Sequence, residues 1–314
     1  MKDRPKNRTP LRVAIVGAGK VGTVLGRVLM EEGARITAVV SRSRSSARTA
    51  ASYLRCRTYA DALTAIPSAT DIVFITTPHD AVGPVAETLS RLEGLEYGRM
   101  GACHASGMLS AAVLEPLGQR GMAVFSFHPL QTFPRSFAPR KIVPTARGIW
   151  YAADGSPRGL HMAARLSRAL RGHVIQVPPE FRELYHASCV VASNHLTVLL
   201  SALREMYGSV AGKEAVSLEP FRPILEATIH NVLATSPREA LSGPVARGGV
   251  DTVAKHLRAV SVSVPALLPY FTRMTLETAR LASEKGTLSA ERRKAMEELI
   301  NPYMQDSSLP GKRT

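Results

Sequence analysis

Three glycines near the start of the sequence have the spacing of a loop that binds the phosphates of a dinucleotide. They lie in GAGKVG (residues 17–22), directly after the apolar, β-branched run 12–16. In a strand-to-helix turn, the first glycine of such a motif permits the tight turn, the second lets the backbone approach a pyrophosphate, and the third lets the helix pack closely on the strand. The amphipathic pattern of residues 20–32 predicts that helix, with its N-terminus toward the phosphates. The expected nucleotide-binding residues are therefore Gly17, Gly19, Lys20, Val21 and Gly22.

The residues after the second predicted strand, 35–41, indicate which dinucleotide binds. At this place a carboxylate would hold the ribose hydroxyls of NAD, but the sequence VVSRSRSS has arginines and serines instead. A guanidinium group can clamp the 2′-phosphate of NADP with two charge-assisted hydrogen bonds. We therefore expect NADP(H), with Arg42 as the clamp and Ser41 and Ser43 as hydroxyl donors. The alternative that Arg42 and Arg44 are only solvated loop charges stays open.

Further candidate residues follow other predicted strands, whose carboxyl ends should share one edge of a parallel sheet. The strand 71–76 leads into Thr77 and Pro78, which we expect to pass over the cofactor. His104 and His128 stand at or just after the ends of strands near 100–104 and 123–127. Delivery of hydride to a carbonyl develops negative charge on oxygen and requires a proton donor or strong hydrogen-bond donors. His128 is the candidate for this role, and a histidine that merely bonds a neighbouring carbonyl is the equal alternative.

The order of the predicted elements defines the fold class. Strands and helices alternate up to about residue 177, where 148–153, 158–171 and 173–177 form a last strand-helix-strand unit. After two prolines only helical patterns remain, at 180–207, 221–233, 251–261, 265–285 and 289–301. We expect a Rossmann-type α/β domain with a doubly wound parallel sheet over 11–178 and an all-α domain over 179–304, with disordered tails at 1–10 and 305–314. A substrate cleft is expected where the two domains meet.

The helical half contains polar residues that could bind a substrate. His186 and Ser193 are seven residues apart and so share one face of the predicted helix 180–207, with Asn194 at its margin. Arg247, in the loop GPVARG, could clamp a carboxylate. Asn231 is a candidate for the same polar cluster, and a buried cap or an inter-helix hydrogen bond is its alternative. The expected catalytic residues are His128, His186 and Asn194, and the expected substrate-binding residues are Ser193, Asn231 and Arg247.

Three segments, taken in order, resemble signature segments of a known family. FHPLQTF (127–133), YHASCVVASNH (185–195) and ALSGPVARGGVDTVAKHL (240–257) are similar to those of predicted NADP oxidoreductases that join a Rossmann domain to a helical domain of formerly unknown function. The family is similar in architecture to ketopantoate reductase, pyrroline-5-carboxylate reductase and the 6-phosphogluconate and β-hydroxyacid dehydrogenases. The resemblance implies NADPH-dependent reduction of a small 2-oxo acid or a related carbonyl or imine, with ketopantoate (2-dehydropantoate) as one candidate.

Two positions depart from the pattern that the resemblance implies. In dehydrogenases of this architecture the first helix of the helical domain supplies a lysine and an asparagine to the substrate. Asn194 matches the asparagine, but residues 180–207 contain no lysine, so the role of the acid would pass to His186, His128 or water. Gly249 stands where the family usually has an acid. Both departures support an alternative function, a catalytically silent NADP-binding sensor or regulatory protein.

Composition narrows the class of protein further. The formal net charge is +15, but the basic residues are dispersed and aromatic residues make up only 5% of the chain, which argues against a nucleic-acid partner. Three scattered cysteines, and nine histidines without close ligand spacing, predict neither a disulfide framework nor a metal site. We expect a cytoplasmic homodimer, joined through the helical domain, that binds a small anionic substrate.

One segment has the length of a membrane span. Residues 184–203 contain no Asp, Glu, Lys or Arg. The segment also contains polar side chains, among them His186 and Asn194, that would be costly in lipid. The charged N-terminus predicts no signal peptide. We therefore expect a helix buried between protein surfaces, and no membrane partner.

Overall fold

The computed structural model describes residues 9–212 and 217–305, and the chain divides into two compact units, Met1–Ser193 and Asn194–Thr314. Most of the two predicted tails lies outside the described residues. The division between the units falls inside the long helical run that follows Pro179, whereas the sequence predicted a domain boundary at residue 178. That domain boundary stays a prediction.

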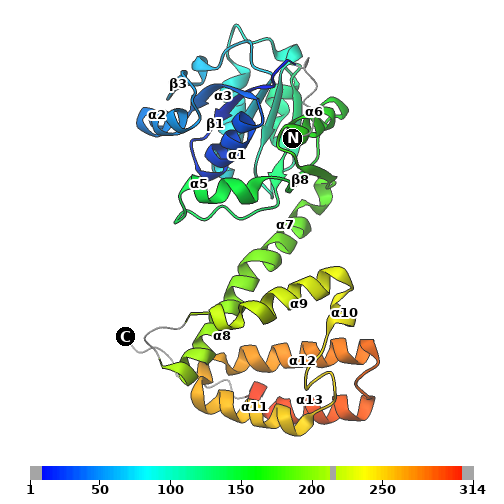
Figure 1. Ribbon diagram of the computed structural model, residues 1–314. Coiled ribbons are helices and arrows are strands. Elements are labelled where there is room, and N and C mark those ends of the chain that lie inside the picture. The colour runs from blue at the N-terminus through cyan, green and yellow to red at the C-terminus, as the bar shows by residue number, and fades with distance from the viewer. Residues whose placement is uncertain (1–8, 213–216, 306–314) are drawn as a thin grey trace. The chain divides into compact units, whose positions relative to one another are not determined.

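The first unit contains a parallel sheet of six strands, which confirms the predicted fold class (Figure 1). The strands are β1 (Arg12–Val16), β2 (Arg35–Val40), β3 (Tyr59–Ala60), β4 (Ile72–Ile75), β5 (Gly101–His104) and β6 (Ala123–Ser126), in the spatial order β3-β2-β1-β4-β5-β6. All neighbouring strands in it are parallel. The order reverses between β1 and β4, and in open α/β sheets this switch point is where ligands bind, at the carboxyl ends of the strands.

Helices cover both faces of this sheet. Val13 and Ile15 of β1 pack in one apolar cluster with residues of α1 (Lys20–Glu31), α2 (Arg44–Tyr53) and α6 (Pro157–Ala169). Ala14 and Val16 pack in a second cluster with α3 (Val82–Ser90) and α4 (Glu115–Gly118). Because successive side chains of a strand point to opposite faces, burial on both faces explains the continuous apolar runs in the sequence.

The strands predicted near 148–153 and 173–177 are present, but they do not extend the large sheet. β8 (Trp150–Ala153) lies between β9 (His173–Gln176), to which it is parallel, and β7 (His128–Pro129), to which it is antiparallel. The short helix α5 (Pro139–Ile142) lies between β7 and β8 in the chain. The small sheet is joined to β6 by hydrogen bonds such as that from Ser126 N to Asp154 O, 2.9 Å.

The second unit is helical, as predicted. Its helices are α8 (Leu196–Ala211), α9 (Arg222–Ala234), α10 (Pro237–Ala240), α11 (Val250–Ser263), α12 (Leu268–Lys285) and α13 (Ala290–Gln305). Its apolar core is made mainly by α11, α12 and α13, through residues such as Leu257, Ala282 and Ile300. α8 buries only Ala202 and Gly208, and α9 buries no residue.

The segment Pro179–Ala211 is long and apolar enough to cross a membrane by length and composition, with a mean hydropathy of 1.3. It comprises α7 (Arg182–Val190), a π-helical stretch Val191–His195 and α8. Only 6% of its most apolar window is buried. The single chain does not bury this segment, because the core of the second unit forms without α8. The expectation of a helix buried between protein surfaces stays a prediction.

Candidate active site

The glycine-rich loop has the geometry expected of a phosphate loop. Gly17 has φ +113°, and a Cβ atom there would lie 2.7 Å from the backbone carbon of Thr76. A Cβ atom on Gly22 would lie 2.5 Å from the carbonyl oxygen of Gly17, so only glycine lets α1 pack this closely. Gly19 faces open space. These positions agree with the roles expected for the three glycines.

The surroundings of this loop fit a dinucleotide. α1 begins at Lys20 without a side-chain cap, which leaves its first backbone N–H groups for an anion. Thr77, directly after the turn that follows β4, has a buried hydroxyl with no hydrogen-bond partner among the described residues. A cavity of about 470 Å³ lies between the loop and α2, lined by Gly19, Lys20, Ser46 and Thr49 among others. The uncapped helix and the unpaired Thr77 hydroxyl are groups that a bound pyrophosphate and its ribose could satisfy.

The two arginines after β2 have different surroundings. The guanidinium of Arg44 lies 5.8 Å from the centre of the Tyr59 ring, a cation–π contact. Arg42 is exposed and has no ion-pair or hydrogen-bond partner in the described parts of the chain. Ser41 is half-buried, and Ser43 caps α2 by accepting a hydrogen bond from Ser46 N, 3.3 Å. Arg42 therefore has no competing contact, while Arg44 is exposed as well and lines a cavity with Arg48 and Thr49.

His104, at the end of β5, serves the fold. It is completely buried, and both ring nitrogens have backbone partners. Nδ1 accepts from Ser106 N at 3.2 Å, so Nε2 carries the proton and donates to Ser110 O at 3.1 Å. Burial lowers the pKa of His104 to about 4, which keeps it neutral. No ring atom is left for a substrate.

His128, at the start of β7, has one ring nitrogen engaged and one available. Its Nδ1 lies 2.6 Å from the hydroxyl of Tyr185, while no group in the described residues hydrogen-bonds Nε2. Burial, and after it the electrostatic influence of His186, Arg182 and His104, lowers the pKa of His128 to about 4. The ring of His186 lies 6.3 Å from that of His128, centre to centre. His128 and His186, two of the three residues expected to be catalytic, therefore lie close together in the first unit.

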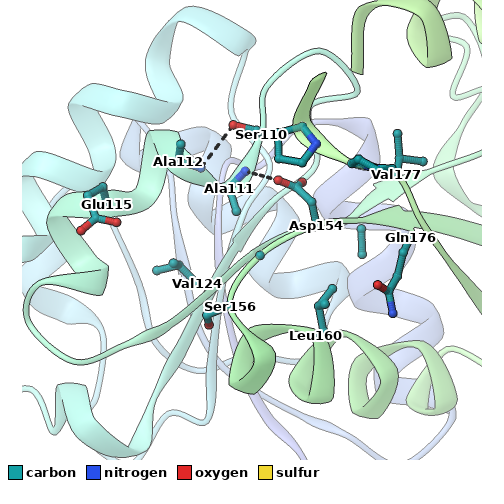
Figure 2. Close-up of a pocket in the computed structure, with 14 residues that line it drawn as sticks. Ser110, Ala111, Ala112, Glu115, Val124, Asp154, Ser156, Leu160, Gln176 and Val177 are labelled. Carbon is teal, nitrogen blue, oxygen red and sulfur yellow. Dashed lines mark hydrogen bonds between the residues drawn. The ribbon is translucent and has the colours of Figure 1, made fainter. Parts of the chain in front are cut away.

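A buried ion pair fixes the start of α7, the helix that carries Tyr185 and His186. Nη2 of Arg182, which is 1% exposed, donates to both the Asp154 carboxylate and the Ser126 hydroxyl. Asp154 also accepts from Ala111 N at 2.9 Å and lines a cavity of about 440 Å³ next to Pro178 (Figure 2). The pair ties α7 to the ends of β6 and β8. The sequence did not predict a role for Ser126, Asp154, Arg182 or Tyr185. Of these, only Tyr185 could have been singled out, because it directly precedes the candidate His186.

The remaining expected site residues lie at the end of the first unit or in the second. Ser193, the last residue of the first unit, donates its hydroxyl to Cys189 O at 2.8 Å. Asn194 is the first residue of the second unit, in the π-helical stretch. Asn231 is exposed on α9, and Arg247 is exposed in the loop before α11. The substrate-binding roles of these four residues stay predictions.

Comparison with known families identifies both halves of the chain. Residues 3–129 match the Rossmann-like domain, and residues 149–278 match a domain of unknown function, DUF2520. The chain therefore consists of a Rossmann-like domain followed by a DUF2520 domain. This combination confirms the resemblance to the oxidoreductase family that joins these two domains. No curated protein matches the sequence.

Several solved structures share the fold. One is a Bacteroides fragilis protein provisionally named an NADP oxidoreductase, with 20% identity over 86% of this chain and 98% of that one, and a TM-score of 0.67. Another is a Thermotoga maritima protein, with 20% identity, coverage of 86% and 99%, and a TM-score of 0.66. A reductive aminase from Aspergillus terreus has 15% identity, coverage of 95% of both chains and a TM-score of 0.55. At these identities the likeness shows the fold.

The buried ion pair leads to a stability prediction. Arg182→Leu leaves the Asp154 carboxylate buried without its cation, so we expect the free energy of unfolding to fall by about 3–5 kcal/mol. Arg222→Leu, which removes an exposed partner of Glu219, should change it by less than about 1 kcal/mol. Replacing Arg182 and Asp154 together by leucine should restore part of the loss. Urea denaturation followed by circular dichroism measures all three, and equal effects of the two single variants would contradict the role given to Arg182.

Proposed function

We propose that the protein is an NADPH-dependent oxidoreductase that transfers hydride to a small carbonyl compound, a 2-oxo acid or a related imine. The observation that carries the proposal is the free Nε2 of His128, in the same unit as the glycine-rich loop and at the end of the parallel sheet where substrates of such folds react. The nicotinamide supplies the hydride when the cofactor is bound. The backbone at Gly17–Gly22 and the Thr77 hydroxyl hold the cofactor, and Arg42 binds its 2′-phosphate.

His128 acts on the oxygen that becomes negative. With a pKa of about 4 it is neutral at pH 7, so it offers one N–H group rather than the charge of an imidazolium ion. A fixed donor in a partly desolvated site stabilises negative charge that develops on a carbonyl oxygen. His186, on the adjoining α7, is the second candidate to contact the substrate.

The class of substrate is supported by the resemblance and by the names of similar structures. The Aspergillus terreus reductive aminase was solved with NADPH and ethyl-5-oxohexanoate or ethyl levulinate, which are oxo compounds. Ketopantoate, which is small, anionic and branched, is the candidate that the resemblance implies. Asn194, Ser193, Asn231 and Arg247 are proposed to bind the substrate. Tight NADPH binding without turnover of any such compound would favour the cofactor-sensing alternative.

We also propose that the protein is a cytoplasmic homodimer and that a second copy covers α8 and α9. Large apolar side chains are exposed on both helices, namely Leu196, Val198, Leu199, Ile224, Ile229 and Leu233. A concentration of exposed apolar side chains on two helices favours an interaction site. A protein partner suits it better than lipid, because α8 and the π-helical stretch before it also expose His195, Asn194 and Thr197.

Cofactor preference tests the role of Arg42. The protein should bind NADPH more than tenfold more tightly than NADH, a difference of at least about 1.4 kcal/mol. Arg42→Asp should reverse this preference, because a carboxylate repels the 2′-phosphate. Arg91→Asp, the same change of charge at an exposed site on another helix end, should leave it intact. Fluorescence titration with both cofactors provides the measurement, and equal affinities in the wild type would rule out the assignment.

The role of His128 can be tested by kinetics with an accepted oxo acid. His128→Gln should lower kcat about 100-fold, since loss of one donor to a developing oxyanion costs about 10²–10³. His161→Gln, at an exposed histidine, is the control. The lowered pKa means that His128 is neutral above pH 4 and gains a proton only as the pH falls through about 4. The kcat/KM profile should therefore show no loss near pH 6.5 from this group, and an inflection there that vanishes in His128→Gln would contradict the account.

The proposed dimer can be tested by sedimentation. The wild type should sediment at twice the chain mass of 33.8 kDa. Ile229→Glu on α9 should give monomers, because it places a charge in the proposed interface. Val262→Glu, at a still more exposed apolar residue of α11, should not. A monomeric wild type at micromolar concentration, or recovery of the wild type with membranes, would show that α8 and α9 serve another purpose.

A further inference from the structure

The hydrogen bond between Tyr185 and His128 has a definite direction. Burial raises the pKa of Tyr185 above its ordinary value, so the phenol keeps its proton. A phenol O–H is a more acidic donor than a neutral imidazole N–H, and an imidazole nitrogen is a better acceptor than a phenol oxygen. The stronger of the two possible bonds at 2.6 Å is therefore the one from Tyr185 Oη to Nδ1 of His128. The remaining proton of the neutral ring is then on Nε2.

A glycine lies against the Nε2 side of His128. A Cβ atom on Gly107 would lie 3.1 Å from Nε2 of His128 and 2.7 Å from Cδ2 of His186. A side chain at this position would press on both rings, so only glycine lets the turn after β5 approach them this closely.

The surroundings of His128 disfavour a cation. Arg182 is charged and lowers the pKa of His128, and the neighbouring rings of His186 and His104 act in the same direction. The carboxylate of Asp154, which is buried nearby, is already paired with Arg182. A group that gains negative charge is stabilised in such surroundings, whereas a positive ligand is not.

We propose that Tyr185 determines the class of substrate. By donating to Nδ1 of His128 it holds the ring proton on Nε2, so that the site accepts the oxygen of an oxo group and rejects the N–H of a protonated iminium ion. This inference rests on the proposed oxidoreductase function and narrows its substrate from a carbonyl or imine to an oxo compound. Tyr185 acts through His128 and is a positioning residue.

The same contact supplies the proton for the reaction. As hydride reaches the carbonyl carbon, the π electron pair of the C=O bond moves onto oxygen. That oxygen takes the proton from Nε2 of His128 as Nδ1 takes the proton of the Tyr185 hydroxyl. Once the alcohol has left, water gives a proton to Nε2, its hydroxide leaves to bulk solvent, and Nδ1 returns its proton to Tyr185, which restores the starting tautomer. The oxo compound, one hydride and one proton give the alcohol. An iminium ion becomes a neutral amine when it receives hydride and needs no further proton on nitrogen. The relay therefore does not promote its reduction.

The tautomer can be read without turnover, by NMR of the full-length protein with ¹⁵N-labelled histidine. His128 should carry its proton on Nε2 at pH 7, with its signals assigned by their loss in His128→Gln. Tyr185→Phe should give a mixture of both tautomers, while His104 keeps its own because backbone groups hold it. A proton on Nδ1 of His128 in the wild type would overturn the proposal.

Kinetics test the selectivity. The wild type should reduce 2-oxoisovalerate with a kcat/KM at least about tenfold above that for pyrroline-5-carboxylate, the protonated cyclic imine. Tyr185→Phe should lower kcat for the oxo acid about tenfold or more and leave NADPH affinity unchanged. Tyr151→Phe is the matched control, because its buried hydroxyl has no hydrogen-bond partner among the described residues. Equal or better reduction of the imine by the wild type would contradict the proposal.

Failure of the proposed function can be recognised separately. If neither compound is reduced, the NMR experiment is repeated with NADP⁺ and one of two unreactive ligands. Oxamate is an analogue of 2-oxo acids, and proline presents a cationic nitrogen. A shift of the His128 Nε2 signal with oxamate and not with proline would support the selectivity. A shift with proline, or with neither ligand, would refute it.

Discussion

The buried ion pair between Arg182 and Asp154 is the interaction on which the candidate site depends. Taking two charges out of water is expensive. Here the carboxylate accepts additional hydrogen bonds from Ser126 and from Ala111 N, whereas Nε and Nη1 of Arg182 are buried without a hydrogen-bond partner among the described residues. Arg182 is the first residue of α7, so the pair fixes where that helix begins. Tyr185 is one helical turn further on and therefore meets His128.

The same pair shapes the electrostatics of the strand ends. Arg182 contributes to the lowered pKa values of His104 and His128, after burial, which is the largest cause in both. The two histidines are thus neutral for the same reasons but differ in their partners. Backbone groups occupy both nitrogens of His104, whereas Tyr185 occupies only one nitrogen of His128. A neutral donor in positive surroundings is suited to a substrate on which negative charge appears.

Much of the Rossmann-like domain could be predicted from local pattern. β1 begins and ends where predicted, and α1 ends one residue earlier, because a doubly buried strand needs an unbroken apolar run and the helix needs an amphipathic one. Pairing between distant strands leaves no such periodic signal, so the sequence did not show that β8 and β9 form a separate small sheet with β7. The exposure of α8 was also missed, because apolar composition indicates burial without saying which chain provides the cover.

The site was predictable only in part. His128 could be found from its place after a strand, and the glycines from their spacing. Ser126, Asp154 and Arg182 are single polar residues far apart in the sequence, and only the folded chain makes them neighbours. Tyr185 was passed over in favour of His186, since an aromatic residue on a helix is more often part of a core than of a site.

The most direct test of the central claim is a crystal structure of the protein with NADP⁺ and oxamate. The account predicts that the carbonyl oxygen of oxamate accepts a hydrogen bond from Nε2 of His128, while the Tyr185 hydroxyl remains on Nδ1 and the pyrophosphate lies against the backbone at Gly17–Gly22. Oxamate bound away from His128, or a His128 ring turned so that Nε2 faces Tyr185, would contradict it.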